Sequence, residues 1–193
     1  MTNEYQPPVL EAQLTSPVGM LLVKASAIGL THLTVVDLKY QSEQVEVCTV
    51  IELITAPCPE ESKVNALQHI NAAHRQLSEY FAGQRQVFEL ALAPKGTVFQ
   101  HQVWQALAAM HFGEVCSYGE IANRIERPKA VRAVGAANGA NPIAIIVPCH
   151  RVIGKNGKLT GYAYGLEMKQ FLLALEARSQ KPEARSQKLE ARG

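Results

Sequence analysis

The chain has 193 residues, 47% of them hydrophobic, and a formal net charge of +2 at pH 7. This length fits one large or two small domains with a packed core. No apolar run approaches the ~18 residues that cross a bilayer, which excludes a membrane protein. The N-terminal stretch MTNEYQPPVLEAQ lacks the basic and apolar segments of a secretory signal. We therefore expect a cytoplasmic protein.

The four cysteines, Cys48, Cys58, Cys116 and Cys149, include no CxxC pair. Without an export signal, free thiols are expected rather than disulfides. We expect no cofactor and no metal. The alternative is a zinc site built from Cys48 and Cys58 with two of the six histidines.

Charge is unevenly distributed along the chain. Residues 1–112 carry 6 Lys and Arg against 10 Asp and Glu, a net of −4, whereas residues 113–158 carry 7 against 3, a net of +4. A basic second half favours binding to a polyanion such as nucleic acid, and an ordinary solvated surface is the alternative.

The first half is typical of a small α/β domain. The stretch LEAQLTSPVGMLLVKAS predicts a hairpin around its SPVG turn, and the β-branched stretches GLTHLTVVD and VEVCTVIELIT predict further strands. A helix is expected to start at Glu61 or Ser62. The apolar face of this helix is expected to consist of Val64, Leu67, Ile70, Ala73, Leu77 and Phe81. After the helix, GQRQVFELALAPKGT is expected to form a linker along the surface.

The second half is expected to be mainly helical. Thr97 can cap a helix over TVFQHQVWQALAAM. Two short helices follow, SYGEIANRI and RPKAVRAVGAANGAN, with Ser117 and Glu120 as a capping box for the first. Pro128 suits the first turn of the second helix and Gly139 its end. The pair has the outline of a helix-turn-helix, and simple core packing is the alternative. In the first of these three helices, one face would carry Phe99, Val103, Ala106, Leu107 and Met110.

The second helix of the pair has few large side chains. Tight helix packing is one explanation, and close approach of its backbone to a nucleic acid groove is the other. Few side chains could read base edges, so binding would tolerate many sequences. The small residues are Ala130, Ala133, Gly135, Ala136, Ala137 and Gly139.

The stretch AIIVPCHRVIG is the candidate reactive site. The apolar run 143–147 predicts a buried strand or extended segment that ends at Pro148 and fixes Cys149 in place. Cysteine reacts as a thiolate, and His150 could take its proton. Neighbouring side chains of an extended segment point apart, so His150 would act through a turn or a water; a buried packing cysteine is the alternative. The acid that orients His150 could be Glu120, Glu126, Glu167 or Glu176.

These residues together resemble a known family. The stretches GTVFQHQVWQALAAMHFGEVCSYGEIANRIERPKAVRAVGAANGANP and NPIAIIVPCHRVIGKNGKLTGYAYGLEMKQFLLALE are similar to the O6-alkylguanine-DNA alkyltransferases. The resemblance implies an α/β, ribonuclease H-like domain over residues 1–93. A mainly α, winged-helix-type domain with the helix-turn-helix would follow over 94–179. The EARSQK repeats of residues 180–193 are expected to form a disordered polar tail.

The resemblance also implies a role for each site residue. Cys149 would be the nucleophile that accepts the alkyl group, His150 its base through a water, and Glu176 the acid that orients His150. Asn141 would support the hinge between the helix pair and the active-site segment, and Tyr118 would contact guanine and donate a proton. Arg151 would be structural. The pocket would consist of Pro148, Val152, Tyr162, Ala163 and Tyr164.

The implied partner is double-stranded DNA that carries O6-alkylguanine, bound through the minor groove with the damaged base flipped out. Arg132 would enter the duplex. The protein would act once, as a monomer, and O4-alkylthymine is a further expected substrate; cooperative assembly on DNA stays open. The remaining DNA contacts would come from Lys129, Ala130, Ala133, Gly135 and Ala136.

One residue departs from the family pattern. Tyr164 stands where family members commonly have the first glycine of a Gly-Gly pair, and its ring would narrow the pocket or stack on the ligand. Two other functions remain open: a damage sensor that binds without transfer, which would lack the acceptor cysteine, and a cysteine hydrolase, which would need a water-activating step.

Overall fold

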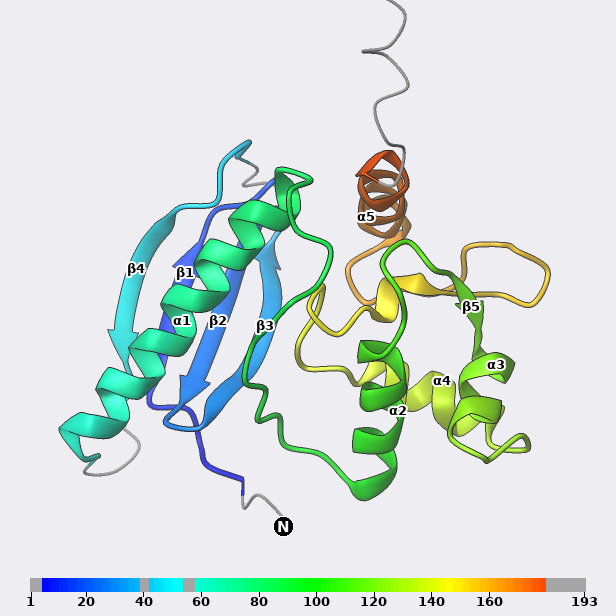
Figure 1. Ribbon diagram of the computed structural model, residues 1–193, viewed down its shortest axis with the longest axis horizontal. Helices are drawn as coiled ribbons and strands as arrows, with labels where there is room; N and C mark the ends of the chain where they lie inside the picture. Colours follow the sequence, from blue (N-terminus) through cyan, green and yellow to red (C-terminus); the bar gives the residue numbers. More distant parts are fainter. Residues whose placement is uncertain (1–4, 39–41, 54–57, 180–193) are drawn as a thin grey trace, which may run out of the picture.

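The computed structural model describes residues 5–38, 42–53 and 58–179. A sheet-rich N-terminal part is followed by a mainly helical C-terminal part, and the two lie side by side (Figure 1). The repetitive tail, for which we predicted disorder, lies outside the described residues.

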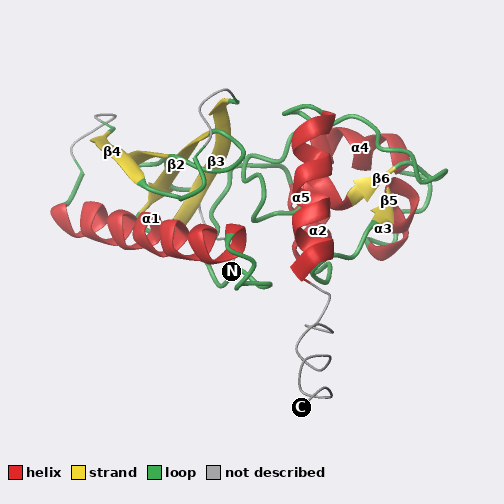
Figure 2. Ribbon diagram, turned by 90° about the horizontal axis from the view of Figure 1, so that it is seen from above, coloured by secondary structure: helices red, strands yellow, loops and turns green. Residues whose placement is uncertain are grey.

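The described residues of the N-terminal part form a four-stranded antiparallel sheet with one helix on it. Its order is β3-β2-β1-β4, and the hairpin predicted around SPVG is confirmed by β1 and β2. The long helix α1 covers one face (Figure 2). The elements are β1 (Leu10–Leu14), β2 (Met20–Ser26), β3 (Gly29–Asp37), β4 (Val47–Glu52) and α1 (Glu60–Phe81).

The buried face of α1 matches the predicted one in part: Ile70, Ala73 and Leu77 are buried as expected, and Phe81 is only half-buried. The helix begins at Glu60, and Val64 and Leu67 are 49% and 39% exposed. The prediction favoured large apolar side chains, whereas the buried face includes small alanines, Ala66 and Ala73, which allow the helix to lie close to the sheet. The residues that face the core are Ala66, Ile70, Ala73, Gln76, Leu77 and Tyr80.

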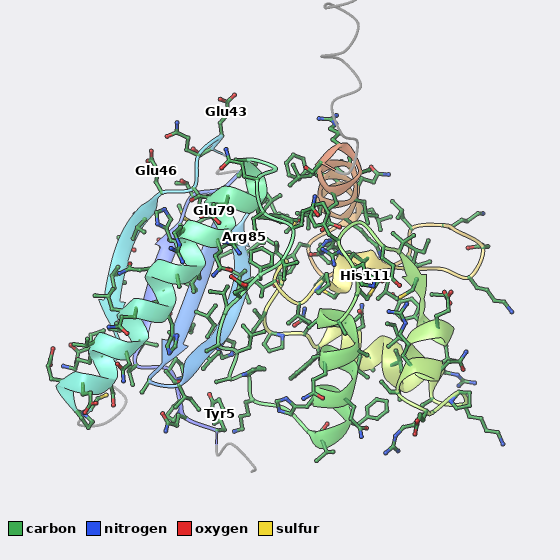
Figure 3. All side chains as sticks on the ribbon, in the orientation of Figure 1. Tyr5, Glu43, Glu46, Glu79, Arg85 and His111 are labelled. Carbon is green, nitrogen blue, oxygen red and sulfur yellow. The ribbon has the colours of Figure 1, made fainter. Side chains whose placement is uncertain are left out.

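We predicted that the linker after α1 runs along the surface, but in the structure it also bonds to the sheet. The amide of Leu30 in β3 donates to the Ala91 carbonyl at 2.8 Å, and the Ala93 amide donates to the Leu30 carbonyl at 2.7 Å. At its start, Arg85 pairs with Glu79 at 2.5 Å (Figure 3). These bonds fix the linker to both the sheet and α1.

Up to residue 179, the last described residue, the C-terminal part has four α-helices, one short 3-10 helix and one small parallel strand pair, β5 with β6. The capping boxes of Thr97 and Ser117 are confirmed at α2 and α3. Pro128 was misplaced: α4 begins at Val131 with Ala130 as its N-cap, so the proline lies in the preceding turn. The elements are α2 (Val98–Ala108), β5 (Cys116–Ser117), α3 (Tyr118–Arg124), α4 (Val131–Gly139), β6 (Val152–Ile153) and α5 (Leu166–Ser179).

The core face predicted for α2 is only partly correct. Val103 and Leu107 are buried, but Phe99 and Ala106 are half-buried, and Met110 is buried beyond the end of the helix. Trp104, which the predicted face omitted, is buried and donates its ring N–H to the Ala137 carbonyl of α4 at 2.9 Å. This bond ties α2 to the helix pair.

The segment that leads to Cys149 is not extended, which corrects our prediction. Residues 144–147 form tight turns, and Ile145 has a left-handed backbone with φ of 69°. A short 3-10 helix, Cys149–Arg151, follows Pro148. The backbone bonds of this segment are local, since the Ile146 amide donates to the Ala144 carbonyl and the Val147 amide to the Ile143 carbonyl. Its pairing with a neighbouring strand is an isolated bridge from Ile143 to Leu33 of β3.

That bridge connects the two parts of the molecule. The Leu33 amide donates to the Pro142 carbonyl, and the Ala144 amide donates to the Leu33 carbonyl, both at 2.9 Å. Strand β3 thereby holds the beginning of the active-site segment.

Within the described ranges, no helix is long and apolar enough to cross a membrane.

Candidate active site

Cys149 lies at the start of the 3-10 helix and is 6% exposed. Asn141 donates from Nδ2 to the Cys149 Sγ at 3.2 Å and to the Val147 carbonyl at 2.8 Å. Its Oδ1 accepts from the Ile143 amide at 3.0 Å. Asn141 comes immediately after Ala140, the C-cap of α4 (Val131–Gly139), so this one side chain joins the helix pair to the turns and to the thiol.

His150 is fully buried and contacts Glu176 of α5. Its Nε2 lies 2.9 Å from the Glu176 Oε1. An ionised carboxylate can only accept, so Nε2 carries the hydrogen and Nδ1 keeps its lone pair. Nδ1 is buried and has no hydrogen-bond partner in the part of the chain that the structure describes. The ring is therefore held in the tautomer that can act as a base.

Glu176 is the centre of a buried polar cluster, which we call the Glu176 cluster: Tyr80, Gly113, His150, Arg151 and Glu176. Besides His150, its carboxylate accepts from Tyr80 Oη at 2.8 Å and from the Gly113 amide at 3.2 Å. Arg151 donates from Nε at 2.9 Å and from a terminal nitrogen at 3.1 Å. Burial alone would raise the pKa of Glu176, but the bonds and charges of His150 and Arg151 outweigh it and bring the pKa to about 2.

Opposing effects act on the pKa of the Cys149 thiol. Burial raises it overall, while the hydrogen bond from Asn141 and the charge of Lys169 act to lower it. Burial has the opposite effect on His150 and lowers its pKa overall, although the hydrogen bond and charge of Glu176 act to raise it. The site thus keeps a neutral thiol beside a neutral imidazole, with groups in place that stabilise a thiolate once it forms.

Lys169 is a site residue that our sequence prediction missed. It is fully buried, and its Nζ donates to the Val152 carbonyl at 2.6 Å and to the Thr160 carbonyl at 2.9 Å. It thereby joins β6 to the loop before α5. The signal was its spacing, because Lys169 lies seven residues before Glu176 on the same helix face.

The predicted pocket residues surround Cys149 on two sides. Pro148 and Val152 flank the 3-10 helix, whereas Tyr162 and Tyr164 come from the loop before α5, with ring centroids 5.6 Å apart. Burial and the neighbouring Cys149 both raise the pKa values of these two tyrosines. Ala163 lies between them in a turn. The two rings thus form one wall beside the sulfur.

Tyr118 is the first residue of α3. It directly follows β5, which pairs with β6 and so aligns Cys116 with Val152. The Tyr118 ring lies against Gly135 of α4, where an added Cβ would be 3.8 Å from it. A hollow of about 770 Å³ opens here between the first turn of α3 and the turn at residues 153–157.

The outer face of α4 is small and exposed. Arg132, Ala133 and Ala136 are exposed, and Lys129 is exposed in the turn before the helix, while Ala130 and Gly135 are half-buried. Neither Arg132 nor Lys129 pairs with an acidic side chain of the described ranges. The small residues therefore leave a flat surface, with a cation at the helix start.

The alternative zinc site in the first half is not assembled. Cys48 is exposed and Cys58 half-buried, and no group of three or more His, Cys, Asp or Glu side chains could hold a metal ion among the described residues. All four cysteines are free thiols, as predicted.

The fold and site together define a class of protein with two features. A buried cysteine accepts a hydrogen bond from Asn141, and a neighbouring pair of helices has an exposed face that carries Lys129 and Arg132. Two family models match: the ribonuclease-like domain of 6-O-methylguanine DNA methyltransferase over residues 9–94, and its DNA binding domain over residues 98–178.

Curated relatives named methylated-DNA--protein-cysteine methyltransferase match most of the chain. The one from Methanosarcina acetivorans is 48% identical over 161 residues, 83% of this chain and 94% of the relative. That from Haemophilus influenzae is 43% identical over 162 residues, 83% and 82% of the two chains. A crystal structure of Mycobacterium tuberculosis OGT in complex with DNA matches with a TM-score of 0.68 and 42% identity, over 86% of this chain and 92% of that one. The chain therefore belongs to the 6-O-methylguanine DNA methyltransferase family.

Proposed function

We propose that this protein repairs DNA by transferring the alkyl group of O6-alkylguanine, and of O4-alkylthymine, irreversibly to its own Cys149. Direct repair by alkyl transfer to a cysteine is the activity of its family. The observation that carries the assignment to Cys149 is its hydrogen bond from Asn141, with His150 and Glu176 next in line. A sensor without an acceptor cysteine does not fit this arrangement.

The transfer is a displacement at the alkyl carbon. The Cys149 thiolate forms a carbon–sulfur bond while the bond from that carbon to guanine O6 breaks, and the electron pair leaves with the base. Tyr118, beside the hollow at α3, donates the proton that makes guanine a better leaving group. The product is a thioether, which no group at the site can cleave, so each molecule reacts once.

The thiol proton passes to His150. A water molecule between the Sγ of Cys149 and the Nδ1 of His150 would carry it, because Nε2 is bonded to Glu176. The imidazolium then lies against an ionised carboxylate, which stabilises it. Asn141 and Lys169 stabilise the thiolate on the other side.

DNA binds across the helix pair. The flat face of α4 suits a minor groove, and Arg132 at its start enters the stack where the damaged nucleotide is flipped out, at a cost of about a few kcal/mol. Lys129 contacts phosphate. Sequence-tolerant binding follows from the scarcity of side chains that read bases. We assign ribonuclease H-like and winged-helix-type folds to the two domains, and a monomer acting in the cytoplasm without a cofactor.

Intact mass measurement tests the transfer. After incubation with a duplex that carries O6-methylguanine, one methyl group should be found on Cys149, and Cys149→Ala should gain none. Cys116→Ala is the matched control and should react like the wild type, because Cys116 is also a buried thiol with a pKa raised to about 11, but its Sγ contacts the Met110 Sδ at 3.6 Å rather than an amide donor. Binding without a mass change would indicate a sensor, and continued turnover without retained methyl would indicate a hydrolase.

Tyr164 limits the size of the alkyl group. Its half-buried ring stands beside Tyr162 at the wall near Cys149. We predict that Tyr164→Gly raises the ratio of O6-butylguanine to O6-methylguanine transfer rates about tenfold, the value of one or two methylenes in a tight pocket. An unchanged ratio would place the ring outside the path of the alkyl chain.

A further inference from the structure

Tyr80 connects the N-terminal part to the Glu176 cluster. It lies in the last turn of α1, is 1% exposed, and donates to the Glu176 Oε1 at 2.8 Å across 96 residues of sequence. This oxygen also contacts His150 at 2.9 Å. One hydroxyl from α1 therefore bonds the same atom that orients the imidazole.

The Tyr80 ring is held firmly in place. Its centroid lies 5.3 Å from those of both Phe81 and Phe88, and 6.3 Å from that of Phe112, which belongs to the C-terminal part. The Arg151 guanidinium lies over the Phe112 ring at 5.7 Å. An aromatic group thus packs from α1 through the linker to the arginine of the cluster.

Two further contacts place the same N-terminal sheet against the site. Strand β3 bonds residues 142 and 144 of the active-site segment through Leu33. The backbone of Val35, also in β3, makes a hydrogen-bonding interaction with Tyr164 that acts to lower the pKa of its hydroxyl. The sheet therefore fixes the residues around Cys149, while Tyr80 of α1 bonds the Glu176 carboxylate that contacts His150.

We propose that Tyr80 is a positioning residue for alkyl transfer, through which the N-terminal domain holds the Glu176 carboxylate in line with His150. The proposal rests on the roles assigned above to Glu176 and His150. A buried tyrosine that merely satisfies its hydroxyl would serve stability alone. The position of its hydroxyl, on the oxygen that contacts His150, is what favours a role in the reaction.

Tyr80→Phe tests this, because it keeps the ring and removes only the bond. The rate constant for methyl transfer at saturating O6-methylguanine duplex should fall about tenfold, as expected for a lost hydrogen bond to a charged group. Duplex affinity should not change, since Tyr80 is buried far from the surface of α4.

The pH profile separates positioning from stability. Without the hydroxyl, Oε1 carries more negative charge and attracts the imidazolium more strongly. The other charged groups that act on His150, namely Arg151 and Lys169, remain. The acidic limb of the rate profile should therefore move to higher pH.

Gln76→Ala is the matched control, since it removes two buried hydrogen bonds between the same helix and Glu89 of the linker and leaves the Glu176 cluster intact. It should lower the melting temperature and leave rate and profile as in the wild type. The proposal is overturned if Tyr80→Phe transfers at the wild-type rate with an unshifted profile, or if Gln76→Ala is equally slow. A Glu176→Gln variant of normal rate would instead refute the roles on which the proposal rests.

Discussion

The Glu176 cluster and the outer face of α4 are organised in opposite ways. The cluster is buried and hydrogen-bonded: its carboxylate accepts five hydrogen bonds from four residues, which come from three separate stretches of the chain. The face of α4 is exposed, and Arg132 and Lys129 contact no acidic side chain of the described residues. The chemistry is thus built before DNA arrives, whereas recognition is completed by the DNA itself.

The strongest test of the prebuilt cluster is Glu176→Gln. The amide has the same shape as the carboxylate, but its NH₂ group is a donor that faces other donors, such as those of Tyr80 and His150. In addition, the buried Arg151 guanidinium loses the negative charge that compensates it. We expect the transfer rate to fall roughly 10²–10⁴-fold and stability to fall by about 3 kcal/mol. Single-turnover kinetics and denaturant unfolding measure both. Glu167→Gln, at an exposed position of the same helix, should change neither.

The second test concerns acid stability. The folded pKa of Glu176, about 2, lies below the ordinary value of 4.5, so its contribution is fully present above pH 4.5 and is lost as pH falls toward 2. It amounts to about 3 kcal/mol. Unfolding free energies measured across this range should drop more steeply for the wild type than for Glu176→Gln. Parallel curves would show that the carboxylate is not stabilised in its charged form.

The third test is Asn141→Ala, at the junction between the two regions. It removes the donor to Cys149 and the bonds to the turns around Ile143 and Val147. Transfer should slow by about tenfold or more, and stability should fall by about 1–3 kcal/mol. Asn123→Ala, on the exposed side of α3, serves as the control for kinetics and thermal unfolding. A normal rate in Asn141→Ala would remove Asn141 from the reaction.

The smallest effects on stability are expected on the face of α4. Arg132→Ala should slow repair of duplex DNA about tenfold while changing stability by less than about 0.5 kcal/mol. Repair of single-stranded substrate should be less affected, because no base has to be flipped.

Lys129→Ala should weaken binding and lower the salt dependence of affinity by about one charge. Arg75→Ala, exposed on α1, should leave binding unchanged.

Sequence patterns predicted local structure better than long-range contact. The capping boxes at Thr97 and Ser117 were predictable because cap and partner lie three residues apart. The turns at residues 144–147 were not, since an apolar run does not distinguish a strand from buried turns. Glu176 could not be selected from four candidates by composition, and only the family resemblance singled it out.

Tyr80 was beyond sequence reasoning for a related reason. A tyrosine on an amphipathic helix is typical of a core position, and nothing local indicates that its hydroxyl meets a carboxylate of another domain. Lys169 was predictable in principle from its helical spacing to Glu176, but a lysine in a closing helix is usually solvated. Both residues act through contacts between elements that the linear pattern does not join.

The distance along the chain between Tyr80 and Glu176 has a consequence for the newly made protein. Cys149 and His150 are synthesised before α5, and His150 meets the Glu176 carboxylate only when α5 docks against both domains. Contacts between such distant residues close late in folding. Under the proposed mechanism, a chain in which α5 has not docked would hold a thiol without an oriented base, so its single transfer would wait until the site and both domains are formed.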